Sequence, residues 1–501
     1  MAPAESLFLP GFAPGDALAE GDTAGDAWCQ QHGPAERRPH GITLTPAWLV
    51  QRMLALADAT AYDTIVDIGA GTGRFAIAAA LANPQARVLA VEDHPQMLAL
   101  LRQRLAQAGL AGRVQVLAGD FRSMALPVAG RTLWLGNPPY VRHHDIPAHW
   151  KHWYRQGMAA RGIAASQLAG LHAHFMLRAV QAMRPGDGLC LVTAAEWLDN
   201  GYGSALRALC TGPGPGMQSL AMQSLRLQSL WLADADQAVF GDALVSAAVL
   251  QLCADGGDQP ARVGRLAEGG WQALRQVDQA RLRDASRWSE FAREHMPQQG
   301  QGPQLGELFH ITRGQVTGMN QVWVLPPGQA LLPQRLTVPA VTRAREIIDD
   351  ALGTPAAVAR LKRVVNLPQD LDLLASAERA AADAFLMSAR RAGADQAYVA
   401  RQRKPWHWLA MRAPPAALVS YMGRRPPVFR ANPQQVSFLN IAHGLYPLQP
   451  LAADVLPPML AALNRSVSKH SGRVYGGGLV KFEPSDIARL RLPADWQDSA
   501  A

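Results

Sequence analysis

The stretch TIVDIGAGTGRFAIAAALA at residues 64–82 constrains the fold more than any other part of the chain. Its opening TIVDI is apolar and β-branched apart from one acid, which is typical of a buried strand. The glycines that follow permit a tight turn, and FAIAAALA has the composition of a helix. A buried strand that passes through glycines directly into a helix is the first unit of a parallel sheet with crossover helices.

The same alternation continues downstream. VLAVED, VQVLAGD and TLWLGNPPY are predicted strands, and PQMLALLRQRLAQAG is a predicted helix between the first two. AHFMLRAVQAM and GSALRALC follow as helices, GLCLVTAAEWL as a strand, and SLWLADADQAVFGDALVSAAVLQL as strands around a turn. This pattern predicts an α/β fold with a doubly wound parallel sheet that is complete by about Leu252.

The length of 501 residues predicts two domains, because single cores stop growing near roughly 250 residues. Residues 1–36 mix small residues with Asp, Gly and Pro and are predicted to be a flexible leader. The first domain is expected at 37–255, a connecting segment at 256–299, and a second, mixed α/β domain at 300–501. Within the second domain, FHITRG is a predicted strand and residues 370–392 contain a predicted helix.

Composition excludes several classes of protein. With 49% hydrophobic and 18% charged residues, the chain is not mainly disordered. The net charge of +8 favours a polyanionic partner only weakly, since an Arg-rich composition can also reflect genome bias. The four cysteines form no CxxC pair, which argues against a metal site or a disulfide framework. Neither a signal peptide nor an apolar run of roughly 20 residues is found, so a cytoplasmic location without a membrane is expected.

The glycine turn is a candidate cofactor site. Asp67, Gly69, Gly71 and Gly73 lie where the first strand turns into a helix, and glycines there let the backbone approach a ligand without a Cβ in the way. A nucleotide-like cofactor fits such a turn. By itself the motif is equally compatible with a structural turn, or with NAD in place of S-adenosylmethionine.

Acids at the ends of the next two strands extend this site. Glu92, followed by Asp93, lies about 20 residues after the glycine turn, where a carboxylate can accept both hydroxyls of a ribose. Asp120 and Phe121 end the third strand and are candidates for an acceptor and an aromatic wall beside an adenine ring. The alternatives are a solvated carboxylate at position 92 and a helix N-cap at position 120.

Asn137, Pro138, Pro139 and Tyr140 end the fourth strand and form the most specific motif. The amino group of adenine is a poor nucleophile, because its lone pair is delocalised into the ring. The Asn137 side-chain oxygen and the Pro138 carbonyl can each accept one amino hydrogen, and the prolines hold both acceptors in place beforehand. Tyr140 can stack on the base. The competing interpretation is an ordinary Asn-Pro or Pro-Pro turn.

Transfer of a methyl group to such an amine needs no strong general base, since the methylated amino group becomes acidic enough to lose its proton to water. No catalytic histidine is therefore expected. His143 and His144, which follow the motif, are predicted to be polar loop residues.

The order of these motifs resembles the gamma class of DNA adenine-N6 methyltransferases, the TaqI/Eco57I-like enzymes. In that class a Thr-Pro helix start, here Thr45 and Pro46, precedes the glycine turn, the NPPY motif and a target-recognition domain. The resemblance implies a Rossmann-like class I methyltransferase sheet with helices on both faces, followed by a mixed α/β target-recognition domain. It also implies S-adenosylmethionine as cofactor, bound partly by Thr45 and Pro46, and double-stranded DNA as partner. The chain departs from the family at His94, where a second acid is usual.

The resemblance further implies that the target adenine leaves the duplex, with Tyr140 and Phe240 on its two faces. The second half resembles the specificity domain of these enzymes in RKPWHWL and YMGRRPPVFRAN, where Trp406, Trp408 and Tyr421 lie among basic residues. The candidate DNA contacts are Arg313, Lys404, Arg424, Arg425 and Arg430. Some of these arginines can instead be solvated surface, and some of the aromatic residues core.

Three functions stay open at this point. The first is a site-specific DNA adenine-N6 methyltransferase of a restriction-modification or phage-defence system, with a separately encoded restriction endonuclease or defence proteins as candidate partners. The second is an NPPY enzyme that modifies RNA or a protein glutamine, and the third is a catalytically silent DNA-binding subunit. The large second half favours DNA over a small substrate, and the intact NPPY motif argues against a silent subunit.

Overall fold

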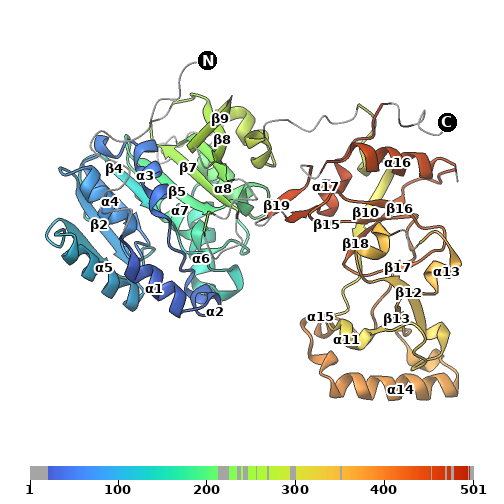
Figure 1. The fold of residues 1–501 in the computed structure, drawn as a ribbon. Coiled ribbons are helices and arrows are strands. Elements are labelled where there is room, and N and C mark those ends of the chain that lie inside the picture. The colour runs from blue at the N-terminus through green and yellow to red at the C-terminus, as the bar shows by residue number, and fades with distance from the viewer. Residues whose placement is uncertain are drawn as a thin grey trace. The chain divides into compact units, whose positions relative to one another are not determined.

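The computed structural model describes residues 21–212, 225–233, 239–240, 246–255, 257–267, 270–293, 301–349, 352–452, 454–468, 471–475, 479–494 and 496 (Figure 1). The chain divides into two compact units. One is Met1–Met296 with Tyr475–Gly477, and the other is Pro297–Val474 with Gly478–Ala501.

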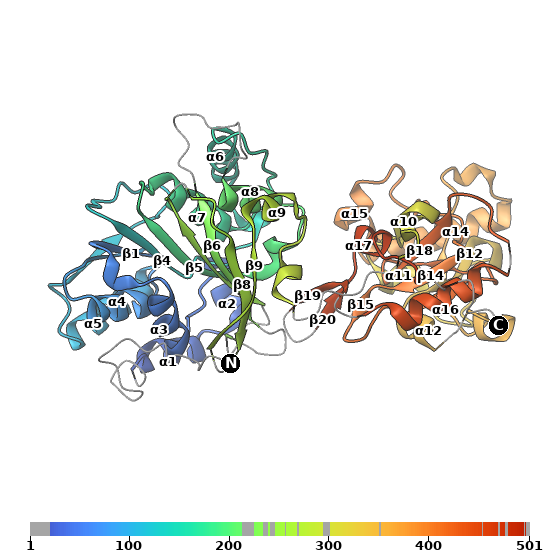
Figure 2. The ribbon, with the colours of Figure 1, turned by 90° about the horizontal axis from the view of Figure 1, so that it is seen from above.

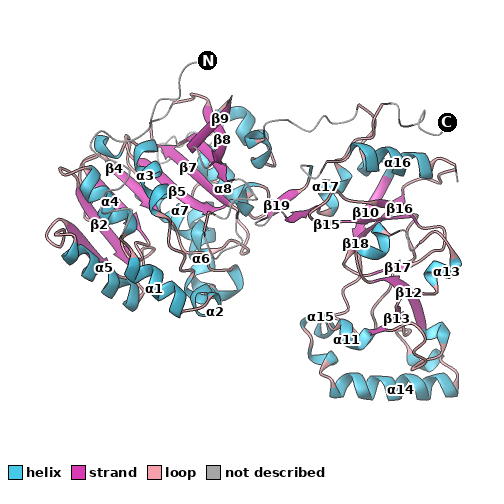
Figure 3. Cartoon of the chain, in the orientation of Figure 1, coloured by secondary structure: helices cyan, strands magenta, loops and turns pink. Residues whose placement is uncertain are grey.

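The first unit alternates strands and helices along most of its length (Figure 3). Its strands are β1 Thr64–Ile68, β2 Arg87–Glu92, β3 Val114–Ala118, β4 Thr132–Gly136, β5 Gly188–Ala194, β6 Arg226–Ala233, β7 Ala247–Cys253, β8 Ala261–Ala267 and β9 Gly270–Val277. Its α-helices are α1 Thr23–Gln31, α2 Pro34–Arg37, α3 Ala47–Leu56, α4 Arg74–Ala82, α5 Pro95–Gln107, α6 Ala148–Ala159, α7 Leu171–Ala182, α8 Ser204–Thr211 and α9 Gln279–Asp284.

These strands form a single sheet in the order β3-β2-β1-β4-β5-β7-β6-β8-β9. From β3 to β5 every pair is parallel, whereas β7 runs antiparallel to both β5 and β6. The strand order reverses between β1 and β4, because β2 and β3 lie on one side of β1 and the later strands on the other. In open α/β sheets, ligands bind at the carboxyl ends of the strands beside such a reversal.

Helices cover both faces of the sheet, as Figure 2 shows. Successive strand residues point to opposite faces, so Ile65 packs with α3, α4 and α5 while Val66 packs with α6, α7 and α8. The same alternation recurs in β5, where Cys190 and Leu191 belong to opposite cores. The prediction of an α/β sheet with helices on both faces is thus confirmed.

The N-terminal leader was predicted to be flexible throughout 1–36, and for its described part this is wrong. Residues 1–20 lie outside the described residues, but α1 and α2 follow directly. Asp22 caps α1 by accepting from the backbone N–H of Gly25, and only 8% of its surface is exposed. Its carboxylate pairs with arginines of α4 and α5, which ties this stretch to the sheet's helices.

The expectation of a connecting segment at 256–299 is also wrong for most of that stretch. β8 pairs with β6 in parallel and β9 pairs with β8, so the sheet gains two strands beyond Leu252. Val263 and Val277 are buried in the same core as α7 and α8. Residues 257–260, directly before β8, are neither helix nor strand and belong to the same unit.

The part of the chain after residue 300 is mixed α/β, as predicted. Its strands are β10 Phe309–Arg313, β11 Val324–Leu325, β12 Thr337–Val341, β13 Arg363–Val365, β14 Ala417–Ser420, β15 Met422–Gly423, β16 Phe429–Ala431, β17 Ser437–Phe438, β18 Ala442–Pro447, β19 Arg473–Tyr475 and β20 Leu479–Lys481. Its α-helices are α10 Leu305–Leu308, α11 Asn320–Trp323, α12 Arg345–Ile348, α13 Pro355–Val358, α14 Ser376–Arg391, α15 Tyr398–Arg401, α16 Leu456–Ser466 and α17 Pro484–Ala488. The strands form three small sheets, ordered β10-β18-β14-β16, β11-β13-β12-β17 and β15-β20-β19. No helix among the described residues has the length and apolar character needed to cross a bilayer.

Candidate active site

A pocket opens at the carboxyl ends of β1, β2, β3 and β4. The residues that follow these strands line it together with the segment at 39–44 and residues of the loop after β4. The lining comprises Pro39, His40, Gly41, Ile42, Thr43, Leu44, Gly69, Gly71, Val91, Glu92, Asp93, His94, Met97, Gly119, Phe121, Arg122, Asn137, Pro139, Val141, Asp145, Ile146, Pro147, Leu171 and Phe175.

The glycine turn between β1 and α4 needs its glycines for two different reasons. Gly71 has a φ of +56°, a conformation that other residues rarely adopt, and its N–H donates to the Glu92 carboxylate. Gly73 has a φ of +83°, and a Cβ there would lie 2.3 Å from Leu101 Cδ1 of α5. The first glycine shapes the pocket wall, and the second lets α5 pack against the turn.

Glu92 is the acid that the turn holds against the pocket. Its two carboxylate oxygens accept three backbone N–H groups, from Gly71 at 2.7 Å, Asp93 at 3.0 Å and His94 at 2.8 Å. Burial raises the pKa of this carboxyl group, and the N–H donors oppose that rise. A carboxylate has about four lone-pair sites, so acceptor capacity remains for a hydroxyl in the pocket.

Asp67 lies beneath the turn. It is fully buried, one of its oxygens accepts from Ala76 N of α4 at 2.9 Å, and the other has no partner. Burial raises the pKa of Asp67 to about 8, and the nearby Glu92 charge adds to the rise. Its hydrogen bond fixes the start of α4.

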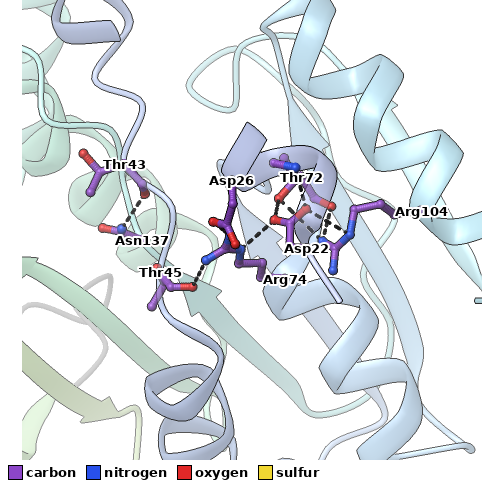
Figure 4. A network of polar contacts seen from close by, with 9 residues as sticks. Asp22, Asp26, Thr43, Thr45, Thr72, Arg74, Arg104 and Asn137 are labelled. Atoms are coloured by element: carbon purple, nitrogen blue, oxygen red, sulfur yellow. Dashed lines mark hydrogen bonds and ion pairs between the residues drawn. The ribbon is translucent and has the colours of Figure 1, made fainter. Parts of the chain in front are cut away.

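The Asn137 side chain is part of the lining of the pocket. Its Nδ2 donates to the Thr43 carbonyl at 3.0 Å, and its Oδ1 is buried with no partner (Figure 4). Because a carbonyl oxygen can only accept, Thr43 forces the amide to present its nitrogen there. The oxygen is therefore left as a pre-oriented acceptor, and an unsatisfied buried acceptor of this kind is typical of a ligand site.

The segment at 41–45 lies directly against the NPPY backbone. Tyr140 N donates to the Gly41 carbonyl at 3.2 Å. Gly41 has a φ of +67°, and a Cβ there would lie 2.5 Å from Tyr140 N. Only glycine allows this approach, which brings the Thr43 carbonyl within reach of Asn137.

The rings of Tyr140 and Phe240 contact each other edge to face, with centroids 6.2 Å apart and planes at 70°. Phe240 is 1% exposed and belongs to the core of α3 and α4. In this arrangement no slot for a third ring lies between them, so a base sandwiched by both would require the two rings to separate. Burial raises the pKa of the Tyr140 hydroxyl, which therefore stays protonated.

Asp120 does not point its carboxylate into the pocket. Arg122 binds that carboxylate through both Nε and Nη2, and the Arg122 N–H also donates to it. The competing interpretation of Asp120 as a helix N-cap does not hold either, because a turn and no helix follows it. Arg122 and the almost fully buried Phe121 line the pocket instead.

His94, at the position where the family has a second acid, belongs to an aromatic cluster at the pocket wall. Its ring lies 4.8 Å from that of His40 and 6.0 Å from that of Trp28 on α1. Burial, followed by the proximity of His40, lowers the pKa of His94 and favours its neutral form. The neutral His94 ring thus lines the pocket beside Glu92, and Trp28 contacts that ring.

The residues around the pocket fit S-adenosylmethionine. The glycine turn offers a backbone surface without side chains, Glu92 retains acceptor capacity for a ribose hydroxyl, and Phe121 and Phe175 offer apolar walls. No group of three or more His, Cys, Asp or Glu side chains suited to a metal ion occurs among the described residues.

Comparisons with known proteins identify the family. The C-terminal domain of the type II methyltransferase M.Eco57I matches residues 292–501, a methyltransferase domain matches 65–156, and the Eco57I restriction-modification methylase matches 134–211. The type II methyltransferase M.XamI of Xanthomonas campestris pv. amaranthicola is 40% identical over 460 residues, which cover 91% of this chain and 85% of that protein. The chain belongs to the type II methyltransferases of restriction-modification systems. Enzymes of this family methylate DNA with S-adenosylmethionine as the methyl donor.

Other proteins resemble this type II methyltransferase at lower sequence identity. The release factor glutamine methyltransferase of Bordetella pertussis is 31% identical over 212 residues, or 39% of this chain and 73% of that protein. The type IIL restriction-modification enzyme MmeI, solved in complex with DNA, superposes with a TM-score of 0.52 at 11% identity over 89% of this chain and 64% of that chain. The DrdV-DNA complex gives a TM-score of 0.51 at 11% identity, covering 96% of this chain and 58% of that chain. At these identities the solved structures show a shared fold.

The structure brings only part of the expected cofactor set to the pocket of the methyltransferase. Gly69, Gly71, Glu92, Asp93 and Phe121 line it. The remaining expected cofactor residues are not among the described residues that line it, namely Thr45, Pro46, Asp67, Gly73 and Asp120. Thr45 and Pro46 precede α3, and Thr45 is 3% exposed.

The expected DNA contacts of the methyltransferase fall into two groups. Lys404, Arg424 and Arg425 are exposed. Arg430 donates to the carbonyls of Ile347 and Ile348 at the end of α12, and Arg313 pairs with Glu483. Two of the nearby aromatic residues pack inward, Trp406 against Trp323 and Tyr421 on His443.

Sequence reasoning missed Thr43 and Gly41, which place the Asn137 amide. A glycine two residues before a threonine carries no local signal, because its role depends on contact with residues almost a hundred positions away. The one clue was the proximity of this stretch to Thr45 and Pro46, which the family resemblance had marked.

Proposed function

We propose that this type II methyltransferase transfers a methyl group to the exocyclic N6 of an adenine that has left the stack of double-stranded DNA. One observation carries the proposal: Asn137 lines the pocket, and its side-chain oxygen is buried, lacks a partner and is fixed by the bond from Nδ2 to Thr43. An oxygen fixed in this way accepts a hydrogen from an amine, and a planar exocyclic amine is the group that needs this help.

Residues of this chain carry the other steps of the proposed reaction. The Asn137 oxygen and the Pro138 carbonyl each accept one hydrogen of the amine, which draws its nitrogen toward tetrahedral geometry. Bound S-adenosylmethionine supplies an electrophilic methyl group. The pocket lies at the edge of a sheet and is too narrow for a duplex, so the target base must swing out to reach it.

Protein glutamine and RNA are the competing substrates. The glutamine methyltransferase relative covers 39% of this chain, whereas the M.Eco57I C-terminal domain matches 292–501. A second unit of that kind supports duplex DNA as the substrate. Exposed cations there, including Lys404, Arg424 and Arg425, are suited to phosphate contacts.

The test is transfer of labelled methyl from S-adenosylmethionine to unmethylated duplex DNA, followed by nucleoside analysis. N6-methyladenine is the expected product, and Asn137→Ala is expected to lose it while still binding S-adenosylhomocysteine. N4-methylcytosine, or label only in RNA or protein, would contradict the proposal. Long-read sequencing of DNA from cells that express either form then gives the sequence context of the modified base.

A further inference from the structure

An acidic residue of the N-terminal stretch, Asp22, forms hydrogen bonds and ion pairs with the glycine turn and with the helices α4 and α5. The Asp22 carboxylate accepts from Arg74 Nε at 2.6 Å and from Thr72 Oγ1 at 2.5 Å, and it pairs with Arg104 at 3.2 Å (Figure 4). Asp22 is 8% exposed, so these charges are held away from water. A buried ion cluster of this kind persists only when its geometry is well satisfied, as it is here.

Arg74 uses its guanidinium to bridge three groups. Nε binds Asp22, Nη2 binds Asp26 of α1 at 2.6 Å, and Nη1 donates to the Thr45 carbonyl at 2.9 Å. A planar guanidinium can donate in three directions at once, which the single ammonium of a lysine on a flexible stem cannot reproduce.

The carbonyl that Arg74 binds belongs to the same short segment that orients the Asn137 amide. At alternate positions, the carbonyls of Gly41, Thr43 and Thr45 accept from Tyr140 N, Asn137 Nδ2 and Arg74 Nη1. Figure 4 shows Thr43 with Asn137 and Thr45 with Arg74 along one stretch of chain. Two of the three bonds thus hold the NPPY motif, and the third ties the segment to α4.

We propose that Arg74, anchored by Asp22 and Asp26, is a positioning residue for methyl transfer, which fixes the 41–45 segment so that Thr43 turns the Asn137 oxygen toward the acceptor amine. This role rests on the function proposed above, because it takes the Asn137 oxygen to be an acceptor for the amine. The N-terminal stretch contacts neither reacting group, and it acts on the Asn137 side of the pocket through Arg74.

Asp22 binds both Arg74 and Thr72, so variants of these two residues test two different effects of that carboxylate. Thr72 lies within the glycine turn, where Asp22 accepts its hydroxyl and Arg104 donates to its carbonyl at 2.7 Å. Loss of the Thr72 hydroxyl therefore loosens the cofactor side of the pocket, whereas loss of the Arg74 guanidinium loosens the Asn137 side. Thr72→Val is expected to raise the KM for S-adenosylmethionine, and Arg74→Lys is expected to lower kcat.

The experiment compares Arg74→Lys with Arg87→Lys as a matched control. Arg87 also donates to a backbone carbonyl and a side chain, Pro127 and Gln115, but at the opposite end of β2. Total label transferred to unmethylated DNA is measured whatever base receives it. Arg74→Lys is expected to lower kcat about 10- to 100-fold, with the KM for S-adenosylmethionine within about threefold of wild type. Arg87→Lys is expected to change neither.

Asp26→Asn supplies a milder variant, because 62% of that side chain is exposed and the change buries no unpaired charge. It is expected to lower kcat about two- to fivefold, and this effect is expected to disappear in the Arg74→Lys background, as a shared pathway requires. Independent effects of the two changes would overturn the proposal.

Hydrogen exchange of the Tyr140 amide tests the same inference without any substrate. Its N–H is bonded to Gly41, so a loosened segment is expected to exchange faster in Arg74→Lys than in Arg87→Lys. Unchanged exchange, or a kcat equal to that of wild type, would overturn the positioning role. A wild-type enzyme that methylates a different base would overturn only the adenine assignment.

Discussion

Asn137 Nδ2 lies 3.0 Å from the Thr43 carbonyl oxygen, although 94 residues separate the two in the chain. This bond decides which end of the carboxamide faces the pocket. A side chain with the same shape but an oxygen in place of the nitrogen would meet the carbonyl oxygen instead, and two acceptors repel each other.

Asn137→Asp is therefore expected to lower kcat by about 100-fold or more, comparable to the loss of one pre-oriented polar group in an active site. Binding of S-adenosylhomocysteine, measured by calorimetry, should stay within a few-fold of wild type because Glu92 and the glycine turn are untouched. Retention of full kcat by Asn137→Asp would show that the Thr43 bond does not set the acceptor.

Gly41→Ala tests the close approach of the 41–45 segment to NPPY. The added Cβ would lie 2.5 Å from Tyr140 N, and alanine disfavours the φ of +67°. We expect a loss of about 1–3 kcal/mol in the free energy of unfolding, with a lower kcat. Gly112→Ala is the control, since nothing lies within 4 Å of a Cβ there and its φ is not positive, so its thermal unfolding should match wild type.

Local motifs were enough to predict much of this site. The glycine turn, Glu92 and NPPY each follow a strand directly, so their placement at one sheet edge follows from the βα pattern. The partners that hold them were not predictable in this way. Asp22 lies in a stretch whose small and acidic residues indicate a flexible leader, yet it becomes buried because Arg74 and Arg104 meet it from helices more than 50 residues away.

The later strands of the first unit also could not be predicted from local sequence motifs. β8 and β9 follow a Gly- and Pro-rich stretch, so the sequence indicated a linker. Their place in the sheet depends on pairing with β6, which is a contact between distant segments. Phe240 was expected to lie across a base from Tyr140, but the two rings meet at an edge, an arrangement set by the core around them.

Asp67 is expected to make stability depend on pH. Its pKa rises from 3.8 in the unfolded chain to about 8 in the folded one, so the folded state binds the extra proton between these values. Its contribution to stability is complete below about pH 4 and is lost as the pH rises to 8, with a slope of at most about 1.4 kcal/mol per pH unit. Asp67→Asn removes this titration, so the stability of wild type minus that of the variant should fall between pH 5 and pH 8 in urea unfolding. A difference that is flat or rises with pH would contradict the assignment.

Variants of Arg424 and Arg430 in the second unit test whether each arginine contacts DNA or supports the fold. Arg424 is exposed and its change to Gln is expected to weaken duplex binding and to reduce the slope of log K against log salt by about 1, as the loss of one phosphate contact requires. Arg430 is half-buried and donates to two carbonyls at the end of α12, so Arg430→Gln is expected to lower the thermal unfolding temperature while leaving the salt slope of the folded protein unchanged. Fluorescence anisotropy over a salt series, with thermal unfolding of the same preparations, distinguishes the two. If Arg430→Gln lowered the salt slope and left stability intact, the guanidinium would be a DNA contact despite its carbonyl partners. If Arg424→Gln left the slope intact, the exposed arginine would be ordinary solvated surface.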